Sequence, residues 1–308
     1  MKIAIVGAGA LGCAIGGVLT EGGNEVWLIN RNADQVEAMT QRGLLLRDGG
    51  VDRAVPVHAA TTAQPVGVAE LVIVLVKSFH TRQAMQAATS LVGPQTVVLS
   101  LQNGLGHEDI LADIVGRDKV LAGKTYAGGT QLGLGHVLIG TRGKDTPIGE
   151  LDGSISERVQ RIAQVFNAAG LAATVSGNIL GTLWDKLLIN VATGALSAIT
   201  RLTYGELYQQ PELEICGVAA VAEAMAVAQA SGIVLSMTEP RQAWVKAGAG
   251  LPEAFKTSML QSLEKGSVTE IDFVNGSVVR WGQRCGVPTP VNQALLACIK
   301  GIERGLPG

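Results

Sequence analysis

The stretch "IAIVGAGALG" at residues 3–12 constrains the fold of this chain most, because three glycines follow a run of apolar residues. Gly7, Gly9 and Gly12 have the spacing G-x-G-x-x-G. Between a strand and a helix, the first glycine allows a tight turn, the second lets backbone approach a pyrophosphate, and the third lets helix and strand pack closely. The spacing alone is weak evidence. Its context decides between a dinucleotide cradle and a glycine-rich turn that binds nothing.

Short apolar runs alternate with helical patterns through the first half of the chain. The runs cover residues 2–7, 25–30, 71–76, 96–101 and 119–123, and helical patterns occur at 10–23 and 81–92. Continuously apolar runs are typical of strands that are covered on both faces, so this alternation predicts a doubly wound parallel sheet. We expect residues 135–140 and 146–151 to extend that sheet in antiparallel fashion. A helix at about 154–169 and a last strand at 171–176 follow.

The pattern changes from about residue 178 onward, where strand-like runs nearly vanish. Apolar residues recur at helical spacing in 180–199, 212–231, 254–265, 268–284 and 290–304, and Pro290 is expected in the first turn of the last helix. The sequence therefore predicts an α/β protein with two domains. An N-terminal Rossmann-type doubly wound sheet (1–177), expected to bind a dinucleotide, precedes an all-helical domain (178–308).

Composition excludes several classes of function. The net charge is −2 and the pI is about 6.1, so nothing indicates the basic face of a nucleic-acid-binding protein. No uninterrupted apolar stretch of ~20 residues predicts a membrane span. The glycine motif lies so near the start that cleavage of a signal peptide would destroy it. We therefore expect a soluble cytoplasmic protein.

The cysteines and histidines do not predict a metal site. No two cysteines have CxxC spacing, and none of the four histidines has a plausible metal-binding partner in the sequence. Free thiols in a reducing compartment are the expected state. His80 lies close to Lys77 but receives no predicted role. The cysteines are Cys13, Cys216, Cys285 and Cys298.

The glycine motif, in this strand–turn–helix context, predicts a phosphate cradle. A helix N-terminus supplies free N–H donors and the positive end of a dipole. We expect the backbone of the whole segment to bind a dinucleotide through Gly7, Ala8, Gly9, Ala10, Leu11 and Gly12. At the end of the second strand stand Asn30 and Arg31 instead of a carboxylate. A guanidinium pairs with a 2′-phosphate, so NADP(H) is favoured over NAD(H), unless Arg31 is an ordinary exposed arginine.

Two further strand ends carry candidate residues, because ligands of doubly wound sheets lie beyond the carboxyl ends of the strands. Lys77 follows the third apolar run, where it contacts the cofactor or an acidic substrate, or is simply solvated. Asn103 follows the fourth run in "SLQNGLG". Its amide can orient a carbonyl or the nicotinamide, and a plain Asn-Gly turn is the alternative.

The helical half offers a second group of polar residues. Lys186 and Asn190 are four apart in "LWDKLLIN" and so share a helix face. An unpaired charge inside an apolar helix is costly, so these residues either face a site or the lysine reaches the surface. "SMLQSLEKGSVTEIDFVNG" adds Ser258 and, after Thr269, Glu270. For Glu270 the alternative is a carboxylate that merely favours a helix N-terminus.

These motifs, taken in order along nearly the whole chain, resemble the ketopantoate reductase (2-dehydropantoate 2-reductase) family. They are GAGALG, the lysine after the third strand, LQNGLG, LWDKLLIN, SML…TEIDFVNG and VPTP. The resemblance implies a Rossmann domain, a helical domain and a cleft between them. It also implies reduction of a 2-keto acid, 2-dehydropantoate, to (R)-pantoate by NADPH, on the route to pantothenate and coenzyme A. The family includes monomers and dimers, so a homodimer is one alternative.

The resemblance also implies roles for the candidate residues. Lys186 is the general acid that protonates the carbonyl oxygen, and Glu270 orients the substrate or Lys186. Asn103 holds the substrate or the nicotinamide. Asn190 and Ser258 bind polar groups of the substrate. Lys77 contacts the cofactor or the bound acid.

The chain departs from the family at positions that are expected to bind the substrate. Gly194 and Tyr204 stand where asparagines are usual, and Ser262 stands where an aspartate is usual. An arginine is also common at the place of Ser267. Missing hydrogen-bond partners can change substrate preference by large factors. A relative that reduces another branched or aromatic 2-keto acid therefore stays an alternative. A dinucleotide sensor without catalysis is less favoured, because a sensor needs neither Lys186 nor Glu270.

Overall fold

The computed structural model describes residues 1–306, so the last two residues of the predicted domain 178–308 lie outside it. The chain forms two compact units. Unit 1 comprises residues 1–102 and 107–179, and unit 2 comprises residues 103–106 and the chain from Leu180 onward. The short segment 103–106 thus packs with the helical unit although it follows a strand of unit 1.

Unit 1 is built on an eight-stranded sheet with the order β12-β11-β8-β7-β6-β1-β2-β5. β11 pairs with β8 in antiparallel fashion, and the strands from β8 to β5 are parallel. The α/β prediction and the five strands expected from apolar runs are confirmed. The strands are β1 (Lys2–Val6), β2 (Glu25–Ile29), β5 (His58–Ala60), β6 (Leu71–Val74), β7 (Val97–Ser100), β8 (Val120–Gly123), β11 (Thr146–Glu150) and β12 (Ala173–Val175).

The direction of winding reverses at β1. The chain proceeds from β1 through β2 to β5 on one side and from β6 to β8 on the other. Val6, the last residue of β1, is in register with Ile29 of β2 and Val74 of β6. The loops that leave these three strands therefore start at the same edge of the sheet. Such a reversal is where doubly wound sheets bind their ligands.

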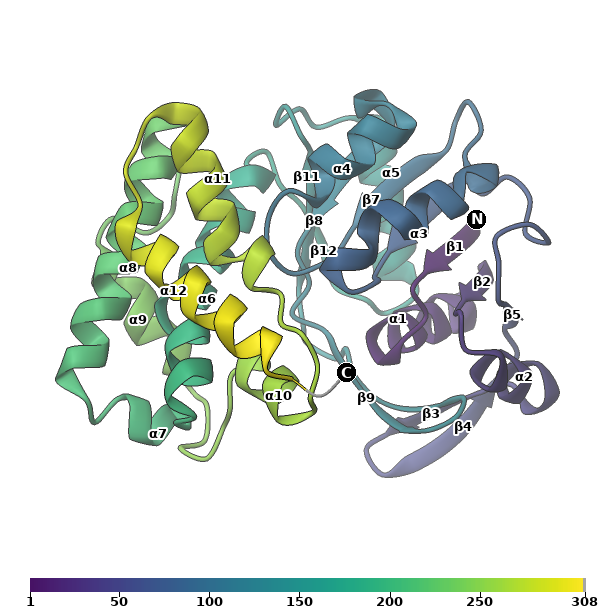
Figure 1. The fold of residues 1–308 in the computed structure, drawn as a ribbon. Helices are drawn as coiled ribbons and strands as arrows, with labels where there is room; N and C mark the ends of the chain where they lie inside the picture. Colours follow the sequence, from purple (N-terminus) through teal and green to yellow (C-terminus); the bar gives the residue numbers. More distant parts are fainter. Residues whose placement is uncertain (307–308) are drawn as a thin grey trace. The chain divides into compact units, whose positions relative to one another are not determined.

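Helices cover the sheet of unit 1. α3 and α4 are in contact with each other and lie side by side in Figure 1. α1 packs very closely on β2, because a Cβ on Gly16 would lie 2.5 Å from Leu28 Cδ2. Ser156 caps α5 by accepting a hydrogen bond from Val159 N at 3.3 Å. The helices are α1 (Ala10–Glu21), α2 (Ala33–Arg42), α3 (Thr81–Ala87), α4 (His107–Val115) and α5 (Glu157–Ala168).

A second sheet of four strands corrects one prediction. Residues 146–150 extend the main sheet in antiparallel fashion, as expected, but the expectation for 135–140 is wrong. That segment forms β10, which pairs with β3 and β9 instead. Its residues alternate between buried and exposed, which suits a sheet with one solvated face. The strands are β3 (Leu44–Asp48), β4 (Val51–Val55), β9 (Gly128–Gly133) and β10 (His136–Gly140), in the order β4-β3-β10-β9.

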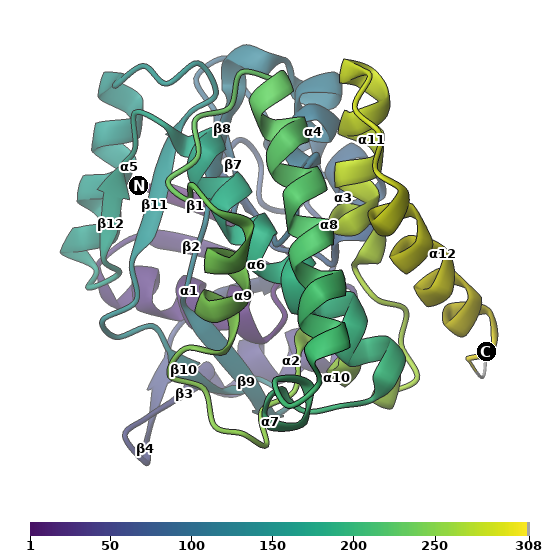
Figure 2. The same ribbon diagram turned by 90° about the vertical axis from the view of Figure 1, so that its left-hand side faces the viewer.

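Unit 2 is helical. Figure 2 shows α8 along its length, and α8 packs against α9, α11 and α12. The last helix starts at Pro290, as expected. The expected helix 268–284 is interrupted, because a short 3-10 helix at Ile271–Phe273 precedes α11. The helices are α6 (Ile179–Thr200), α7 (Tyr204–Leu207), α8 (Pro211–Ala230), α9 (Pro240–Gly248), α10 (Ser258–Glu264), α11 (Asn275–Cys285) and α12 (Pro290–Arg304).

Two helices of unit 2, α6 and α8, are long and apolar enough to cross a membrane by length and composition alone. In α6, 67% of the most apolar window is buried, and in α8, 33%. The core helix of a soluble protein passes the same test, so the two helices are weak evidence for a membrane span. α6 lies in the core of unit 2, since Leu187, Leu188 and Val191 are almost fully buried.

Candidate functional site

The glycine loop joins β1 to α1, and its three glycines have different surroundings. Gly7 has a φ of +103°, and a Cβ there would lie 2.4 Å from Val76 N. A Cβ on Gly12 would lie 2.5 Å from Gly7 O. Both glycines are therefore required by close packing of backbone. A Cβ on Gly9 would meet nothing within 4 Å, so the space beside Gly9 is open.

The first turn of α1 provides the donors of this loop. Gly9 is the N-cap residue, and no side chain caps the helix. The N–H groups of the first turn have no partner within a helix, so they are available to an anion. Ala8 is fully buried, and its N–H donates to Ile29 O at 2.9 Å. Ala8 thus anchors the loop, while the open side of Gly9 and the start of α1 form a cradle that fits a pyrophosphate.

The end of β2 braces the cradle and presents a cation. Asn30 Nδ2 donates to Ala8 O at 2.7 Å, and Asn30 Oδ1 accepts from Asn32 N at 2.9 Å. Asn32 then caps α2 by accepting from Gln35 N. Asn30, a predicted cofactor residue, therefore uses its side chain to hold the glycine loop. Arg31 is exposed, and its side chain has no hydrogen-bond or ion-pair partner among residues 1–306.

The turn after β6 is held by a buried polar network. Gln102 Nε2 donates to Val76 O and to Thr81 Oγ1, both at 2.8 Å. Thr81 Oγ1 also lies 3.2 Å from His107 Nδ1, and Gln102 Oε1 accepts from Ser100 Oγ at 3.2 Å. The network fixes the segment from Val76 to Thr81. Lys77 lies within that segment and is exposed.

The charge around the cradle is positive. Within the described chain, the side chains of Arg31 and Lys77 form no ion pair with a carboxylate. Burial lowers the pKa of His80, and the positive charge of Arg31 lowers it further. His80 ends the short 3-10 helix that follows Lys77. Two cations and a histidine thus lie on the loops that leave β2 and β6 beside the glycine loop, and neither cation has an acidic partner among residues 1–306, which favours binding of an anion.

The loop 103–106 packs within unit 2, on the segment before α11. Leu105 N donates to Phe273 O at 3.0 Å, and Ser277 Oγ donates to Leu105 O at 2.9 Å. A Cβ on Gly104 would lie 2.4 Å from Phe273 O, so the approach requires glycine. Asn103 is exposed. The structure thereby places Asn103 in the same unit as the four candidates of the helical half.

α6 carries the predicted pair Lys186 and Asn190, both partly buried, on one helix face. The neighbouring Asp185 accepts from Ser236 N at 3.1 Å, which ties α6 to the segment after α8. One turn beyond Asn190, Gly194 is buried, and a Cβ on it would lie 3.4 Å from Met259 Cε. α6 therefore holds Lys186 and Asn190 on one face. Its next turn, at Gly194, packs against α10.

Ser258 and Glu270 lie at the ends of short elements. Ser258 is the exposed first residue of α10, and its carbonyl accepts from Ser262 Oγ at 3.0 Å. Glu270 is partly buried and precedes the 3-10 helix at Ile271–Phe273. The residue before it is anchored, because Thr269 N and Thr269 Oγ1 both donate to Glu303 Oε1 at 2.7 Å. This clamp positions the backbone of Glu270.

Glu303 is an anionic clamp inside unit 2. Burial raises the pKa of its carboxyl, but hydrogen bonds from Lys300 and Thr269 outweigh this and the pKa is lowered. Lys300 Nζ lies 2.9 Å from Glu303 Oε2. Glu303 was not among the residues predicted from the sequence. The pair with Lys300 is local, but the contact that matters for the candidate site is not, because Thr269 lies 34 positions away along the chain.

Tyr204 lies in an aromatic group of unit 2. Its Oη lies 3.1 Å from Thr193 Oγ1, and its ring centroid lies 6.1 Å from that of Phe255. Burial raises the pKa of Tyr204, while the hydrogen bond with Thr193 lowers it. The position where the resemblance leads one to expect an asparagine is therefore filled by a packed, hydrogen-bonded phenol.

Several residues that shape the cradle escaped the sequence analysis. Gln102 and Thr81 form the network described above, and Gln102 adjoins Asn103. In β9, a Cβ on Gly129 would lie 2.5 Å from Ala10 O, so β9 packs on the start of α1. "LQNGLG" contained a signal for Gln102, a polar residue at the end of an apolar run. No comparable signal marked Gly129.

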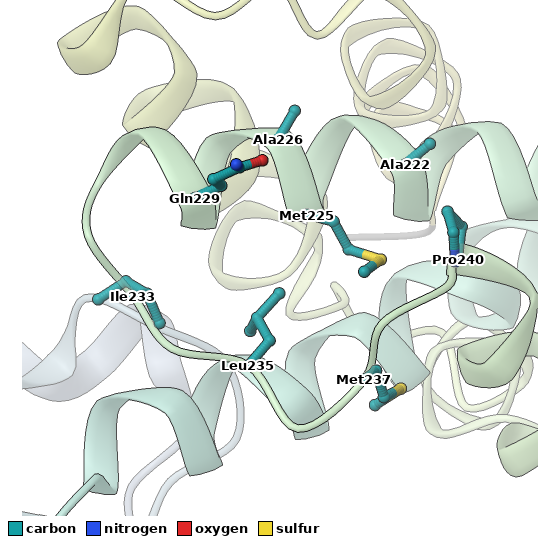
Figure 3. A pocket seen from close by; sticks show the side chains of 8 residues that line it. All are labelled: Ala222, Met225, Ala226, Gln229, Ile233, Leu235, Met237 and Pro240. Carbon is teal, nitrogen blue, oxygen red and sulfur yellow. The ribbon is translucent and has the colours of Figure 1, made fainter.

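An apolar cavity of about 390 Å³ lies in unit 2, between α8 and the segment that leads to α9 (Figure 3). Met225 and Leu235 point toward each other across it, and Met237 is among its lining residues. No ionisable side chain is among its lining residues. It has none of the groups needed for acid–base chemistry. Within residues 1–306, no cluster of three His, Cys, Asp or Glu side chains is suited to a metal ion.

Comparison with known proteins covers both units. The family model described as ketopantoate reductase PanE/ApbA matches residues 3–153, and its C-terminal counterpart matches residues 178–303. The 2-dehydropantoate 2-reductase of Archaeoglobus fulgidus is 33% identical over 305 residues, which is 99% of both chains. That of Pyrococcus horikoshii is 34% identical over 303 residues, which is 98% of both chains.

Solved structures agree with these sequence matches. A PanE/ApbA family ketopantoate reductase from Ralstonia eutropha JMP134 is 36% identical, with a TM-score of 0.89 over 99% of both chains. D-mandelate dehydrogenase with NADH and anilino(oxo)acetate is 28% identical, with a TM-score of 0.90 over 99% of both chains. The two family models leave only short parts of the chain unmatched. The chain therefore belongs to the ketopantoate reductase family of oxidoreductases.

Proposed function

We propose that this chain is an NADPH-dependent 2-dehydropantoate 2-reductase that forms (R)-pantoate for pantothenate and coenzyme A synthesis. The observation that carries the proposal is the match to proteins of that name, at 33–34% identity over 98–99% of the chain. The polar residues of α6 and the Glu270 segment support it, because they match the family's motifs one by one.

The cofactor proposal rests on the fit of the cradle to a phosphorylated dinucleotide. Bound NADPH supplies a hydride. The open side of Gly9 and the start of α1 hold the pyrophosphate. Arg31 pairs with the 2′-phosphate, and Lys77 contributes a second positive charge. Asn30 keeps the glycine loop in place through its hydrogen bond to Ala8 O.

The candidate residues of unit 2 act on the 2-keto acid. Lys186 donates a proton to the carbonyl oxygen, and its ammonium stabilises the negative charge that develops there. Glu270 orients the substrate or Lys186. Asn103, Asn190 and Ser258 bind polar groups of the substrate. These roles account for a lysine held on a largely buried helix, and a sensor that only binds a dinucleotide would need neither Lys186 nor Glu270.

A second candidate function is reduction of another branched or aromatic 2-keto acid. Gly194 and Tyr204 favour it, since both replace asparagines expected from the family and Tyr204 is hydrogen-bonded to Thr193. A structural neighbour at 28% identity is D-mandelate dehydrogenase. A pocket that has lost two of its expected amide groups discriminates less well for a substrate hydroxyl.

Location and assembly follow as further proposals. The described cysteines are all free, which suits the cytoplasm. A homodimer and a monomer are the two alternatives for the assembly of the chain. Light scattering after gel filtration distinguishes the two by mass.

The experiment that tests the function measures initial rates of NADPH oxidation at pH 7. Ketopantoate, 2-ketoisovalerate and phenylglyoxylate are compared by kcat/KM, with NADH as the control cofactor. A clear preference for ketopantoate supports the first proposal. Equal or faster turnover of the other two acids supports the second. Tight NADPH binding without turnover of any acid would support the sensor.

A further inference from the structure

Three loops meet around the glycine cradle, and the third contains a histidine without an assigned role. Val6 is in register with Ile29 and Val74, so the loops after β1, β2 and β6 leave the sheet at one level. A Cβ on Gly7 would lie 2.4 Å from Val76 N, so the β6 loop lies directly against the glycine loop. His80 belongs to that β6 loop.

The backbone of His80 is fixed by its own turn. His80 N donates to Lys77 O at 2.8 Å, which closes the turn. The ring centroids of Phe79 and His80 are 4.6 Å apart, in an edge-to-face arrangement. The side chain is partly buried, and the polar network of Gln102 and Thr81 fixes the same segment. His80 therefore has a defined position next to the cradle.

The charge that acts on His80 in the structure is positive. Arg31, from the loop after β2, lowers the pKa of His80 in addition to the effect of burial. Lys77 lies three residues earlier in the same turn. Arg82, at the start of α3, is paired with Asp113 at 2.9 Å. Without an anion, a protonated His80 would face uncompensated positive charge.

We propose that His80 is a specificity-determining residue of the 2′-phosphate site, which becomes an imidazolium beside Arg31 when that phosphate binds and is neutral otherwise. The inference rests on the proposed function only in taking the cofactor to be phosphorylated. It adds to that function a proton that is taken up together with NADPH and not with NADH.

The sign of the effect follows from linkage. A phosphate dianion beside the imidazole stabilises its charged form and opposes the influence of Arg31, so phosphate binding raises the proton affinity of His80. Binding that takes up a proton becomes tighter as the pH falls. A change of one unit in the proton affinity corresponds to about tenfold in cofactor affinity. The 2′-phosphate loses charge at low pH, which acts in the opposite direction.

The test measures binding rather than turnover. Dissociation constants for NADPH and NADH are determined by calorimetry at pH 6.5 and pH 8.5, in two buffers that differ in ionisation enthalpy. The protein is compared with His80→Gln and with the matched control His58→Gln, in β5, whose imidazole stacks on Trp27. Wild type and His58→Gln should bind NADPH about tenfold more tightly at pH 6.5 and take up protons. NADH binding should not change.

The result that overturns the inference is specific. His80→Gln should lose the proton uptake and the pH dependence of NADPH binding while its NADH affinity stays unchanged, which also shows that it is folded. An unchanged pH dependence in His80→Gln, with NADPH still preferred over NADH, would overturn the role of His80 alone. Wild-type protein that does not prefer NADPH over NADH would overturn the cofactor proposal and this inference together.

Discussion

Gly9 in unit 1 and Gly194 in unit 2 are both small residues at candidate sites, yet their surroundings differ. A Cβ on Gly9 meets nothing within 4 Å, whereas a Cβ on Gly194 lies 3.4 Å from Met259 Cε. Among residues 1–306, no close contact requires glycine at position 9, and this open space is what the proposed pyrophosphate would occupy. The packing of α6 near α10 limits what position 194 can hold.

The charged residues of the two units show the same contrast. Within residues 1–306, the side chains of Arg31 and Lys77 have no anionic partner. In unit 2, Glu303 holds Thr269 and Lys300, and so fixes the backbone next to Glu270. The candidate site in unit 1 is marked by cations that have no anionic partner among residues 1–306. The site in unit 2 is recognised by groups that the protein holds in place.

The largest expected effect is a loss of kcat in Lys186→Ala, which tests whether catalysis belongs to unit 2. Lys186→Ala should lower kcat by about 10² to 10⁴, because it removes a positioned general acid. NADPH affinity should change little, since the cradle is in unit 1. Steady-state kinetics and fluorescence titration measure the two effects. Lys246→Ala, on the exposed side of α9, is the matched control. A variant that keeps its kcat and loses NADPH affinity would reverse the assignment.

A smaller effect tests the unpaired cation of unit 1. Arg31→Ala should weaken NADPH binding by about 10- to 100-fold, because charge-assisted hydrogen bonds to phosphate are lost. NADH affinity should stay within about twofold, since that cofactor has no 2′-phosphate. Titrations with both cofactors measure the ratio. Equal losses for the two would mean that Arg31 does not contact the phosphate.

The two kinds of glycine in the cradle provide a direct comparison. Gly12→Ala places a Cβ 2.5 Å from Gly7 O and should lower the free energy of unfolding by about 1 to 3 kcal/mol. Gly9→Ala should cost at most about 1 kcal/mol, from its position as N-cap, but should weaken NADPH binding at least tenfold. Urea unfolding and cofactor titration are measured on both variants. If Gly9→Ala lost stability but kept its NADPH affinity, the open space beside Gly9 would not be the pyrophosphate site.

The smallest effect concerns the clamp in unit 2. The pKa of Glu303 is lowered by its partners in the folded chain, so its contribution to stability is present above the ordinary glutamate pKa of about 4.3. That contribution is lost as the pH falls through the lower pKa of the folded state. Glu303→Gln should remove about 1 to 2 kcal/mol at pH 7. Urea unfolding at pH 7 and pH 3.5 should show a smaller gap between wild type and variant at the lower pH.

Much of the fold and part of the site follow from local sequence patterns. The apolar runs that form β1, β2 and β6 are short, continuous and bounded by turns, so strands were predictable. The glycine spacing predicts the β1–α1 turn, because it satisfies local backbone geometry. β10 was assigned to the wrong sheet, since β4 and β9 lack continuous apolar runs and the apolar run of β3 is only three leucines long.

The candidate site shows the same division. Lys186 and Asn190 share a face because a helix repeats every 3.6 residues, so their alignment required no tertiary information. Gln102, His80 and Glu303 were not predicted to matter. Gln102 and Glu303 have partners about 20 to 35 positions away, and the charge that influences His80, Arg31, is 49 positions away. Such partners are chosen by packing of whole elements, which periodicity does not encode.

The sequence by itself determined the strand–turn–helix cradle, the positive residue at the end of β2 and the polar face of α6, because each depends on residues a few positions apart. Only the tertiary structure decided that residues 103–106 pack with unit 2 and that the positive charge of Arg31 lowers the pKa of His80. It also decided that the space beside Gly9 is open. These features depend on how segments that are distant in the sequence pack against one another. That is settled by burial and hydrogen bonding across the whole unit rather than by local conformational preference.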